Sequence, residues 1–385
     1  MSGWPTVPMG QLCSIQSGKS DTKDAVQDGP YAFFDRSKTI KRSSRYLRDC
    51  EALIIPGEGT EFLPRYFNGK FDLHQRAYAL FDFSRDINVR FLFYYLHHVA
   101  DYFPRVAVGA TVKSLRLRHF EQLPVVLARV PEQQRIVHIL DEAFDGIAKA
   151  RASADKNLQN VRALFQCAYI SVFDEAVTGG YQRTTVADVA HQSKGSMRTG
   201  PFGSQLLHSE FVDEGIAVLG IDNAVNNKFR WDKRRYISED KYQELSRYQV
   251  KPGDVLITIM GTCGRCAIVP DDIPTAINTK HLCCITLDAG RCIPGFLHSY
   301  FLYHPVAQQF LAARAKGSIM AGLNMGIISE LPVLLPTLKQ QQYVVDKVDS
   351  LVEETQRLES IYQRKLAALD KLKKSLLHQA FSGNL

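Results

Sequence analysis

Two segments of the chain combine basic side chains with asparagine and aromatic residues, the residue types that contact nucleic acid. Residues 37–48 carry five Lys or Arg, and residues 222–236 carry three Asn and five Lys or Arg around Phe229 and Trp231. Lys and Arg attract phosphate, and Arg and Asn form paired hydrogen bonds with the edges of guanine and adenine. A solvated basic surface would have the same composition, but two matched segments favour contact with DNA or RNA.

We therefore expect the nucleic-acid contacts to come from these segments and from nearby polar positions. In the first 130 residues the candidates are Lys19, Lys38, Lys41, Arg42, Arg45, Arg65, Arg76, Lys113 and Arg116. Beyond residue 180 they are Lys194, Arg198, Ser204, Asn223, Asn226, Asn227, Lys228, Arg230, Lys233, Arg234, Lys280, Lys316 and Asn324. The formal net charge of +7 permits this role without establishing it.

Motifs for catalysis, metal binding or cofactor binding are incomplete. Residues 13–20 resemble a phosphate-binding loop, but Cys13 stands where the loop requires glycine. Cys263 and Cys266 have the spacing of zinc ligands, yet Cys283 and Cys284 lack the spacer that lets two thiolates reach one ion. We expect no catalytic residues, no metal and no cofactor bound by this chain.

The composition predicts a globular protein outside the membrane. Hydrophobic residues make up 45% of the 385 positions and charged residues 23%. No apolar run approaches the roughly 18 residues of a membrane-spanning helix. The start of the chain has no signal-peptide pattern, and the eight cysteines are scattered, so we expect a cytoplasmic protein with reduced thiols.

The elements that must position the candidate residues occur twice, at an offset of 208 positions. Residues 123–127, LPVVL, return as LPVLL at 331–335, and Gln133-Gln134 returns as Gln341-Gln342. Asp141, Leu158, Leu164 and Phe173 recur as Asp349, Leu366, Leu372 and Phe381. A register that does not slip indicates an internal duplication.

Each copy ends in a long amphipathic helix. Apolar residues recur at spacings of three and four from Pro131 to about residue 180 and from Lys339 to about residue 383, with no internal proline. Leu164 and Leu372 belong to the expected seam. The first helix ends where the second domain begins, so we predict an antiparallel two-helix coiled coil. Two long helices in the core of a bundle are the alternative.

The remaining segments are predicted to be mixed, mostly β domains, each with one helix near its end, at about 87–103 and 294–313. The expected divisions are 1–130 and 181–338 for the two domains, and 131–180 and 339–385 for the two helices. The predicted fold class is α+β: two duplicated mixed α/β domains at opposite ends of a long antiparallel two-helix coiled coil, with pseudo-two-fold symmetry.

This order of segments resembles the specificity subunit of type I restriction–modification enzymes. Leu123-Pro-Val, residues 131–136 and residues 141–144 are similar to the central conserved region of that family, and residues 331–383 are similar to its distal conserved region. The segments Gly200-Pro-Phe-Gly-Ser204, Gly261-Thr262 and Asn278-Thr-Lys280 resemble recurring elements of its target recognition domains. The first domain lacks the Gly-Pro-Phe-Gly-Ser element.

The resemblance implies that each domain is a target recognition domain that reads one half of a bipartite site in double-stranded DNA. The helices would separate these domains and dock two methyltransferase subunits, which bind S-adenosylmethionine. Motor-nuclease subunits would complete a restriction complex, and this chain would have no catalysis of its own. Two other classes stay open: a coiled-coil scaffold that binds only protein, and a nuclease with an unrecognised site.

Overall fold

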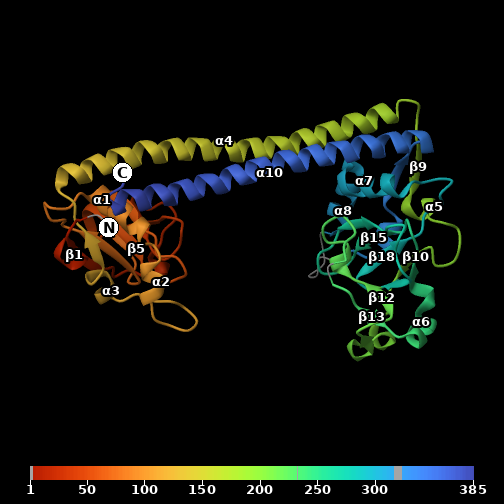
Figure 1. Ribbon diagram of the computed structural model, residues 1–385, viewed down its shortest axis with the longest axis horizontal. Coiled ribbons are helices and arrows are strands. Elements are labelled where there is room, and N and C mark those ends of the chain that lie inside the picture. Colours follow the sequence, from red (N-terminus) through yellow and green to blue (C-terminus); the bar gives the residue numbers. More distant parts are fainter. Residues whose placement is uncertain (1–2, 232, 316–322) are drawn as a thin grey trace. The chain divides into compact units, whose positions relative to one another are not determined.

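The computed structural model describes residues 3–231, 233–315 and 323–385, and it divides the chain into two units (Figure 1). Unit 1 contains residues 1–157 and 362–385, and unit 2 contains residues 158–361. Two long helices, α4 (Val130–Ala176) and α10 (Leu338–Ser382), each contribute one end to each unit. In the described ranges, no helix has the length and apolar character needed to cross a membrane.

Unit 1 is built on a six-stranded sheet with the order β2-β7-β5-β6-β3-β4. Its strands are β2 (Ser14–Ser17), β3 (Tyr31–Phe34), β4 (Lys41–Ser43), β5 (Arg48–Pro56), β6 (Arg65–Leu73) and β7 (Ala77–Phe81). Neighbouring strands are antiparallel except β3 and β6, which are parallel. The unit also has the strand pair β1 (Thr6–Pro8) and β8 (Pro124–Val126), the helices α1 (Val89–His98), α2 (Tyr102–Val106) and α3 (Leu117–Glu121), and the 3-10 turns η1 (Met9–Gln11) and η2 (Thr22–Asp24).

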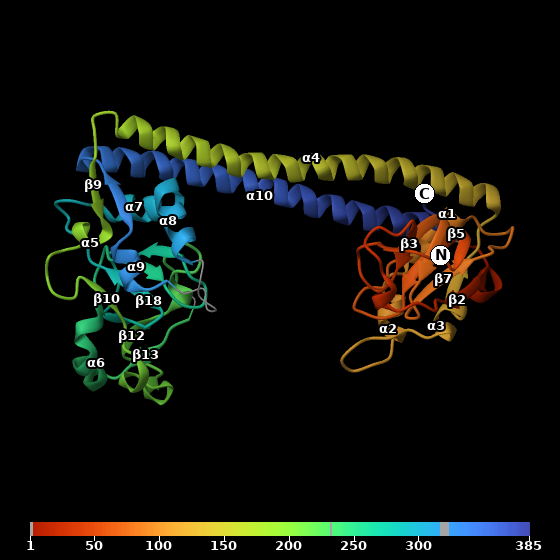
Figure 2. The same cartoon turned by 180° about the vertical axis from the view of Figure 1, so that it is seen from behind.

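Alternation along β5 explains how this sheet separates two cores. Leu53 and Ile55 point into a core shared with α1 and the ends of α4 and α10, whereas Ala52 and Ile54 point into a second core on the other face. Successive side chains of a strand face opposite ways, so a continuous apolar run is buried on both faces. Helix α1 therefore packs between the sheet and the ends of the long helices (Figure 2).

Unit 2 divides its strands between two main sheets. The four-stranded sheet has the order β10 (Met197–Thr199), β18 (Leu282–Ile285), β15 (Val255–Thr258), β16 (Cys266–Ile268). The five-stranded sheet has the order β11 (Phe211–Val212), β13 (Tyr236–Ile237), β12 (Ile216–Leu219), β17 (Ala276–Asn278), β14 (Gln249–Val250). The strands β9 (Gln182–Thr185) and β19 (Pro332–Leu335) form a separate antiparallel pair. The helices are α5 (Val186–Val189), α6 (Glu239–Leu245), α7 (Pro294–Tyr303), α8 (Pro305–Ala315) and α9 (Met325–Ser329), with the 3-10 turns η3 (Gly203–Gln205), η4 (His208–Glu210), η5 (Ile221–Asn223) and η6 (Ser246–Tyr248).

The two units share one strand plan, so the duplication extends into the β domains. The order β2-β7-β5-β6 in unit 1 corresponds to β10-β18-β15-β16 in unit 2, and the parallel pair β3–β6 corresponds to β12–β17. Strand β6 is continuous and pairs with both β5 and β3. In unit 2 the same role is divided between β16 and β17, which lie in different sheets. One long strand has been interrupted, and one sheet has become two.

The helix predicted near the end of each domain is broken into two. In unit 1 the break lies between α1 and α2, ahead of Pro104, and in unit 2 it lies at His304, ahead of Pro305. Proline lacks an N–H group and clashes with the preceding turn, so a single helix cannot run through either position. The predictions of one helix at 87–103 and one at 294–313 were therefore wrong in this respect.

The long helices pack antiparallel in both units. In unit 1, Phe144 of α4 and Leu376 and Phe381 of α10 pack in one core, and in unit 2, Phe173 of α4 packs with Val344 and Val348 of α10. In each unit the early part of one helix therefore meets the late part of the other.

The seam differs from the predicted one at two positions related by the repeat. The side chain of Leu164 is 68% exposed and that of Leu372 is 47% exposed. The next residue after Val161 that faces the seam is Phe165, four positions later, and its ring packs on Tyr303. The prediction had placed Leu164, three positions later, in the seam. The heptad interpretation of these two leucines was wrong.

Ion pairs across the helices repeat with the offset of the sequence. Arg151 pairs with Asp370 in unit 1, and Arg162 pairs with Glu359 at 2.6 Å in unit 2. Arg151 and Glu359 are 208 positions apart, as are Arg162 and Asp370, so each pair joins the same two repeat positions. Exposed ion pairs contribute little to stability, but these two set the same antiparallel register in both units.

A buried glutamine ties each long helix to its domain. Gln133, at the start of α4, accepts a hydrogen bond from the Asn88 backbone N–H at 2.7 Å and donates to the carbonyls of Asp86 at 2.7 Å and Ala128 at 2.8 Å. Its side chain has no exposed surface. All three hydrogen bonds of the Gln133 side-chain amide are made to backbone groups of unit 1.

Gln341, at the start of α10, makes the same set of bonds in unit 2. Its amide accepts from the Ile293 N–H at 2.9 Å and donates to the carbonyls of Arg291 and Pro336, both at 2.9 Å. It too is fully buried. The repeated Gln-Gln dipeptide of the sequence thus marks the joint between helix and domain, with the first glutamine buried and the second exposed.

We predict that Gln133→Met and Gln341→Met each lower the free energy of unfolding of the unit concerned by about 2–4 kcal/mol, because two carbonyls and one N–H lose their buried partners. The matched controls Gln134→Met and Gln342→Met, at exposed positions, should change it by less than about 0.5 kcal/mol. Urea unfolding measures the change, and hydrogen exchange at the Asn88 and Ile293 amides locates it. Equal effects of buried and exposed substitutions would contradict this assignment.

Candidate nucleic-acid interface

Close backbone contacts position the first loop of each domain. A Cβ atom on Gly18 would lie 1.8 Å from the Leu73 carbonyl oxygen, and one on Gly200 would lie 1.9 Å from that of Asn278. No side chain fits at these distances, so both positions require glycine. Gly18 follows β2 and Gly200 follows β10, the equivalent strand, so the Gly-Pro-Phe-Gly-Ser element has a structural counterpart in unit 1 despite the different sequence.

This contact also explains the resemblance of residues 13–20 to a phosphate-binding loop. The Lys19 and Ser20 backbone N–H groups both donate to the Leu73 carbonyl, so they do not point at a ligand. The Ser20 hydroxyl lies 2.8 Å from both carboxylate oxygens of the buried Asp72. Cys13 is buried, and burial raises the pKa of its thiol to about 12.

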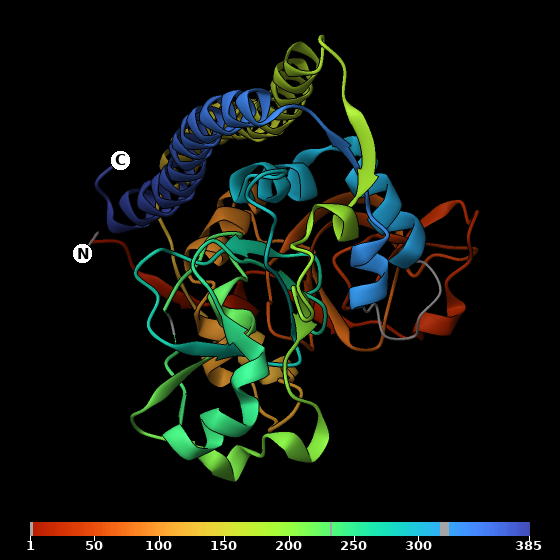
Figure 3. The ribbon, with the colours of Figure 1, turned by 90° about the vertical axis from the view of Figure 1, so that its right-hand side faces the viewer.

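The two basic segments of the sequence overlap equivalent hairpins, and Lys38, Lys41 and Arg42 are the cations of the first segment that lie in its hairpin. Residues 35–40 join β3 to β4 in unit 1, and residues 220–235 join β12 to β13 in unit 2. In unit 2, which Figures 1 and 3 show from two sides, this hairpin reaches the helices: the His298 ring of α7 lies 3.0 Å from the Asn227 carbonyl oxygen, and residues 226–228 line a pocket with Val348 and Glu353 of α10. The two segments are similar in composition, and the strand pairing places the first part of 37–48 and most of 222–236 at the same point of the fold.

Most candidate cations of unit 1 are already engaged inside the unit. Their partners are Glu61 for Lys38, Asp35 for Lys41, the Gly29 and Pro30 carbonyls for Arg42, Asp24 and Asp72 for Arg45, the Ser37 carbonyl for Arg65, and Glu58 for Arg76. Burial of Asp35 opposes its ionisation, but its hydrogen bonds to Lys41 and Ser37 outweigh burial and lower the pKa of that carboxyl. Lys19, Lys113 and Arg116 are exposed, and their side chains have no ion pair or hydrogen bond among the described residues.

Unit 2 presents more polar and basic groups that are free to contact a ligand. Exposed side chains without an ion pair or hydrogen bond in the described part of the chain are those of Lys194, Ser204, Asn226, Lys228, Arg230 and Lys233. Lys280 is half-buried, and the guanidinium of Arg234 lies 5.8 Å from the centre of the Trp231 ring. Phe202, in the loop after Gly200, is 48% exposed. Arg234 and the half-buried Trp231 combine a cation with an aromatic ring, as nucleic-acid surfaces do.

Arg198 belongs to the interior, contrary to its selection as a candidate contact. Its guanidinium pairs with the buried Asp254 at 2.5 Å and donates to the Gln249 carbonyl at 2.6 Å and the Thr286 hydroxyl at 3.0 Å. Its side chain is 9% exposed. An arginine with its donors used in this way joins two strands and a loop, and we leave it out of the interface.

Three asparagines among the candidates have structural bonds. Asn223 is fully buried and bonds the Gly220 N–H and the Arg230 carbonyl, which folds the hairpin on itself. Asn227 has a φ of +56° and accepts a hydrogen bond from the Cys266 N–H at 3.2 Å. Asn324 caps α9 by accepting from the Ile327 N–H at 2.9 Å. Lys316 lies outside the described residues.

A cavity of about 780 Å³ opens beside the hairpin of unit 2. It is lined by His208, Phe211, Gly220, Ile221, Asp222, Val225, Lys233, Arg235, Thr279 and His281. Burial and the nearby Lys280 and Arg235 lower the pKa of His281, which keeps its ring neutral at pH 7. Of these residues only Lys233 had been selected from the sequence.

Arg235, the arginine that lines this cavity, was not among the residues predicted from the sequence. The segment 222–236 contains five cations, and composition does not distinguish among them. Arg235 pairs with Asp222, as Lys41 pairs with Asp35 at 2.6 Å in unit 1. Lys41 lies opposite Phe33 of β3, and Arg235 lies opposite Val218, the equivalent residue of β12. The two hairpins differ in length, so this correspondence does not follow from the spacing in the sequence.

Three cysteines of unit 2, Cys266, Cys283 and Cys284, lie in the four-stranded sheet. Cys283 faces the core beneath the helices, and the adjacent Cys284 faces the opposite core, so their thiols diverge. Burial raises the pKa of Cys283 to about 12. Within the described residues, no group of three or more His, Cys, Asp or Glu side chains is arranged to hold a metal ion.

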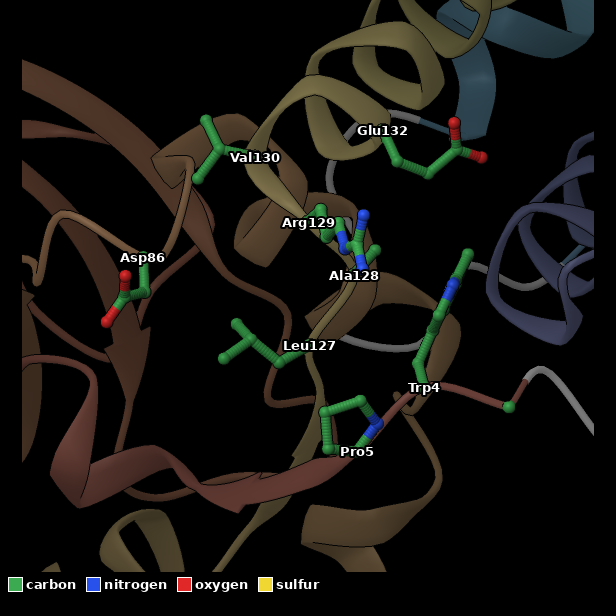
Figure 4. A pocket seen from close by; sticks show the side chains of 9 residues that line it. Trp4, Pro5, Asp86, Leu127, Ala128, Arg129, Val130 and Glu132 are labelled. Atoms are coloured by element: carbon green, nitrogen blue, oxygen red, sulfur yellow. The ribbon is translucent and has the colours of Figure 1, made fainter.

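Each unit has a small pocket beside the start of its long helix. The pocket of unit 1 has a volume of about 520 Å³ and is lined by Gly3, Trp4, Pro5, Asp86, Leu127, Ala128, Arg129, Val130 and Glu132 (Figure 4). The pocket of unit 2 has a volume of about 450 Å³ and includes Tyr181, Leu335 and Pro336. The pairing of β1 with β8 and of β9 with β19 puts Trp4 and Tyr181 at the same position. The two pockets are therefore copies of one feature.

Comparisons with known proteins agree with this architecture. The family model described as type I restriction modification DNA specificity domain matches residues 1–153 and 209–365. The EcoDI type I restriction enzyme specificity subunit of Escherichia coli is 22% identical over 413 aligned residues, which cover 99% of this chain and 88% of that protein. The MjaVIII specificity subunit of Methanocaldococcus jannaschii is 19% identical over 406 residues, covering 99% and 93%.

The fold is also that of a solved structure. One solved structure is described as the structural basis of complex assembly and conformational transition of the type I restriction–modification system. A chain of that structure superposes on this one with a TM-score of 0.73 at 16% sequence identity, and the superposition covers 100% of this chain and 99% of that one. Two β-rich units, each held by the start of one long helix and the end of another, define the class. The chain belongs to the type I restriction–modification DNA specificity family. It is a DNA-recognition subunit and not a catalytic one.

We predict that Arg198→Met lowers the free energy of unfolding of unit 2 by about 3–5 kcal/mol, because it leaves Asp254 as an uncompensated buried charge. The exposed neighbour provides the control, since Lys194→Met should cost less than about 0.5 kcal/mol. Thermal and urea unfolding measure both. A stable Arg198→Met protein whose DNA affinity alone falls would return Arg198 to the interface.

Proposed function

We propose that this chain reads a bipartite site in double-stranded DNA, with residues 1–130 and 181–338 as the target recognition domains for its two halves. Residues 131–180 and 339–385 would form the antiparallel coiled coil between them, with pseudo-two-fold symmetry. The observation that carries the proposal is the shared strand plan of the two units together with equivalent basic hairpins. Two domains with the same fold but different amino-acid sequences are suited to recognise two different DNA half-sites.

The proposed DNA contacts are the exposed polar groups that the fold leaves available. They are Lys19, Lys113 and Arg116 in the first domain and Lys194, Ser204, Asn226, Lys228, Arg230, Lys233, Arg234 and Lys280 in the second. The paired cation of the first hairpin, Lys38, can exchange the exposed carboxylate of Glu61 for a phosphate because such pairs are weak in water. Cations held in this way favour binding without specifying bases.

Two methyltransferase subunits are the proposed partners on the helices. The joints at Gln133 and Gln341 and the pockets at Trp4 and Tyr181 come in equivalent pairs. A duplicated surface presents the same contacts twice, so it suits two copies of one partner. These subunits would bind S-adenosylmethionine and supply the chemistry, and motor-nuclease subunits would join them for cleavage. The proposal places the assembly in the cytoplasm with its DNA.

The helices provide the proposed spacing between half-sites. Helix α4 has 47 residues and α10 has 45. At roughly 1.5 Å per residue, each is about 70 Å long, which is about two turns of B-DNA. The bases between the half-sites would then remain unread. Equivalent domains on antiparallel helices would face opposite strands, which suits methylation of one adenine on each strand.

A matched insertion tests this spacing. Seven residues of coiled-coil sequence inserted both between Asn157 and Leu158 and between Gln363 and Arg364 keep the register set by the two interhelical ion pairs. Each helix becomes about 10 Å longer, so the gap should grow by about three base pairs while the half-site bases stay the same. Methylome sequencing of cells with the partner methyltransferase subunits measures the site.

The control is the variant with the insertion in α4 alone. It should be less stable than the wild type, because the residues of α4 after the insertion no longer lie opposite their partners on α10. An unchanged gap in an active double-insertion variant would show that the helices do not set the spacing. A change in the half-site bases would show that the domains do not read independently.

A further inference from the structure

Buried polar atoms without partners gather in one region of unit 2. Among the described residues, six buried side-chain N and O atoms have no hydrogen-bond partner, and four of them are Asp222 Oδ2, Arg235 Nε, Asn278 Oδ1 and Thr279 Oγ1. Asp222, Arg235 and Thr279 line the cavity of about 780 Å³ at the hairpin. Buried polar groups in native proteins almost always have partners, so such a cluster beside an open cavity indicates a ligand with complementary donors and acceptors.

The backbone is shaped to hold the Arg235–Asp222 pair at this cavity. A Cβ atom on Gly220 would lie 2.6 Å from Arg235 Nη2 and 3.0 Å from Asp222 Oδ1, so the glycine makes room for both side chains. Asp222 lies in the 3-10 turn η5, which Asn223 closes through its bond to the Gly220 N–H at 2.8 Å. The side chains of Arg235 and Asp222 are 35% and 25% exposed, so a ligand in the cavity can reach them.

The charges of the pair fit a base edge better than a phosphate. Asp222 neutralises the guanidinium and would repel a phosphate oxygen, whereas the free cations Lys228, Arg230 and Lys233 have no such neighbour. A guanidinium that is held by a carboxylate has its N–H donors fixed in direction, which favours hydrogen bonds to acceptors at defined positions. Guanine offers two acceptors in the major groove, O6 and N7, and its partner cytosine offers the N4 donor. The partly exposed guanidinium of Arg235 and carboxylate of Asp222 are the matching donor and acceptor groups.

We propose that this cavity reads one G·C base pair of the half-site of unit 2, with Arg235 donating to guanine and Asp222 accepting from cytosine. The inference rests on the proposed binding of duplex DNA by unit 2. Thr279 Oγ1 provides a further hydrogen-bonding group at the cavity, and the rings of His208 and Phe211, with centres 5.8 Å apart, form an apolar wall.

The test uses the purified full-length chain and a pool of DNA duplexes with a randomised core. Selection identifies the bound sequence, and binding isotherms at several salt concentrations give the affinity and its salt slope. Arg235→Lys keeps the charge and removes the fork, so it should lose between about 5-fold and 150-fold in preference for G·C at one position. Preferences at the other positions and the salt slope should stay unchanged.

Asp222→Asn is the second variant, and it should relax the same base pair. Lys233→Ala is the matched control on the same cavity wall, and it should weaken binding to all sequences alike and reduce the salt slope by about 1, as loss of a phosphate contact does. Thermal unfolding shows that each variant is folded before its binding is compared.

The outcomes separate this inference from the proposed function. A wild-type chain that selects no duplex sequence overturns the proposed function and the inference with it. A wild-type chain that selects a site, combined with an Arg235→Lys variant that loses affinity for all sequences equally, overturns the inference alone. Relaxation at an A·T pair, or no change in either variant, overturns it as well.

Discussion

The structure depends on the joint at which each long helix leaves its domain. A helix that starts at a domain surface can pivot unless its first turn is fixed, and here a fully buried glutamine fixes it through three backbone hydrogen bonds. Gln341 repeats the bonds of Gln133 at nearly the same distances. The cost of leaving buried backbone groups unpaired makes these joints intolerant of change, which accounts for the repeated Gln-Gln dipeptide.

Each domain is held a second time by the end of the other helix. Phe381 packs on Phe91 and Tyr95 in unit 1, and Phe173 packs on Phe296 and Tyr300 in unit 2. Both helices are therefore shared between the units, and unit 1 is completed by residues 362–385 from the other end of the sequence. In this arrangement the long helices and the domain cores form a frame that is fixed by many contacts, whereas the hairpins can differ in sequence and length. The frame repeats residue by residue, whereas the hairpins differ in length and sequence, as expected when the frame holds two readers of different DNA.

Much of this frame could be predicted from the sequence, and the available groups of the candidate interface largely could not. The helices repeat at a fixed offset because heptad periodicity, the buried glutamine and the terminal phenylalanines each leave a pattern in sequence. Leu164 was misplaced because two adjacent residues, Leu164 and Phe165, both fit the spacing of the seam. Arg198 and Arg235 were misjudged for a different reason. Whether a cation is buried in an ion pair or faces a cavity depends here on carboxylates more than 10 residues away in the sequence, Asp254 and Asp222.

The central claim is that two equivalent units each read one half of the DNA site. Replacing residues 4–122 by a second copy of residues 181–330 gives a chain with two copies of the second domain on the native helices, joined at equivalent strand positions. Methylome sequencing with the partner methyltransferase subunits should then find a symmetric site, with the second half-site repeated in inverted orientation and the gap unchanged. An active chain that still methylates an asymmetric site would contradict the account.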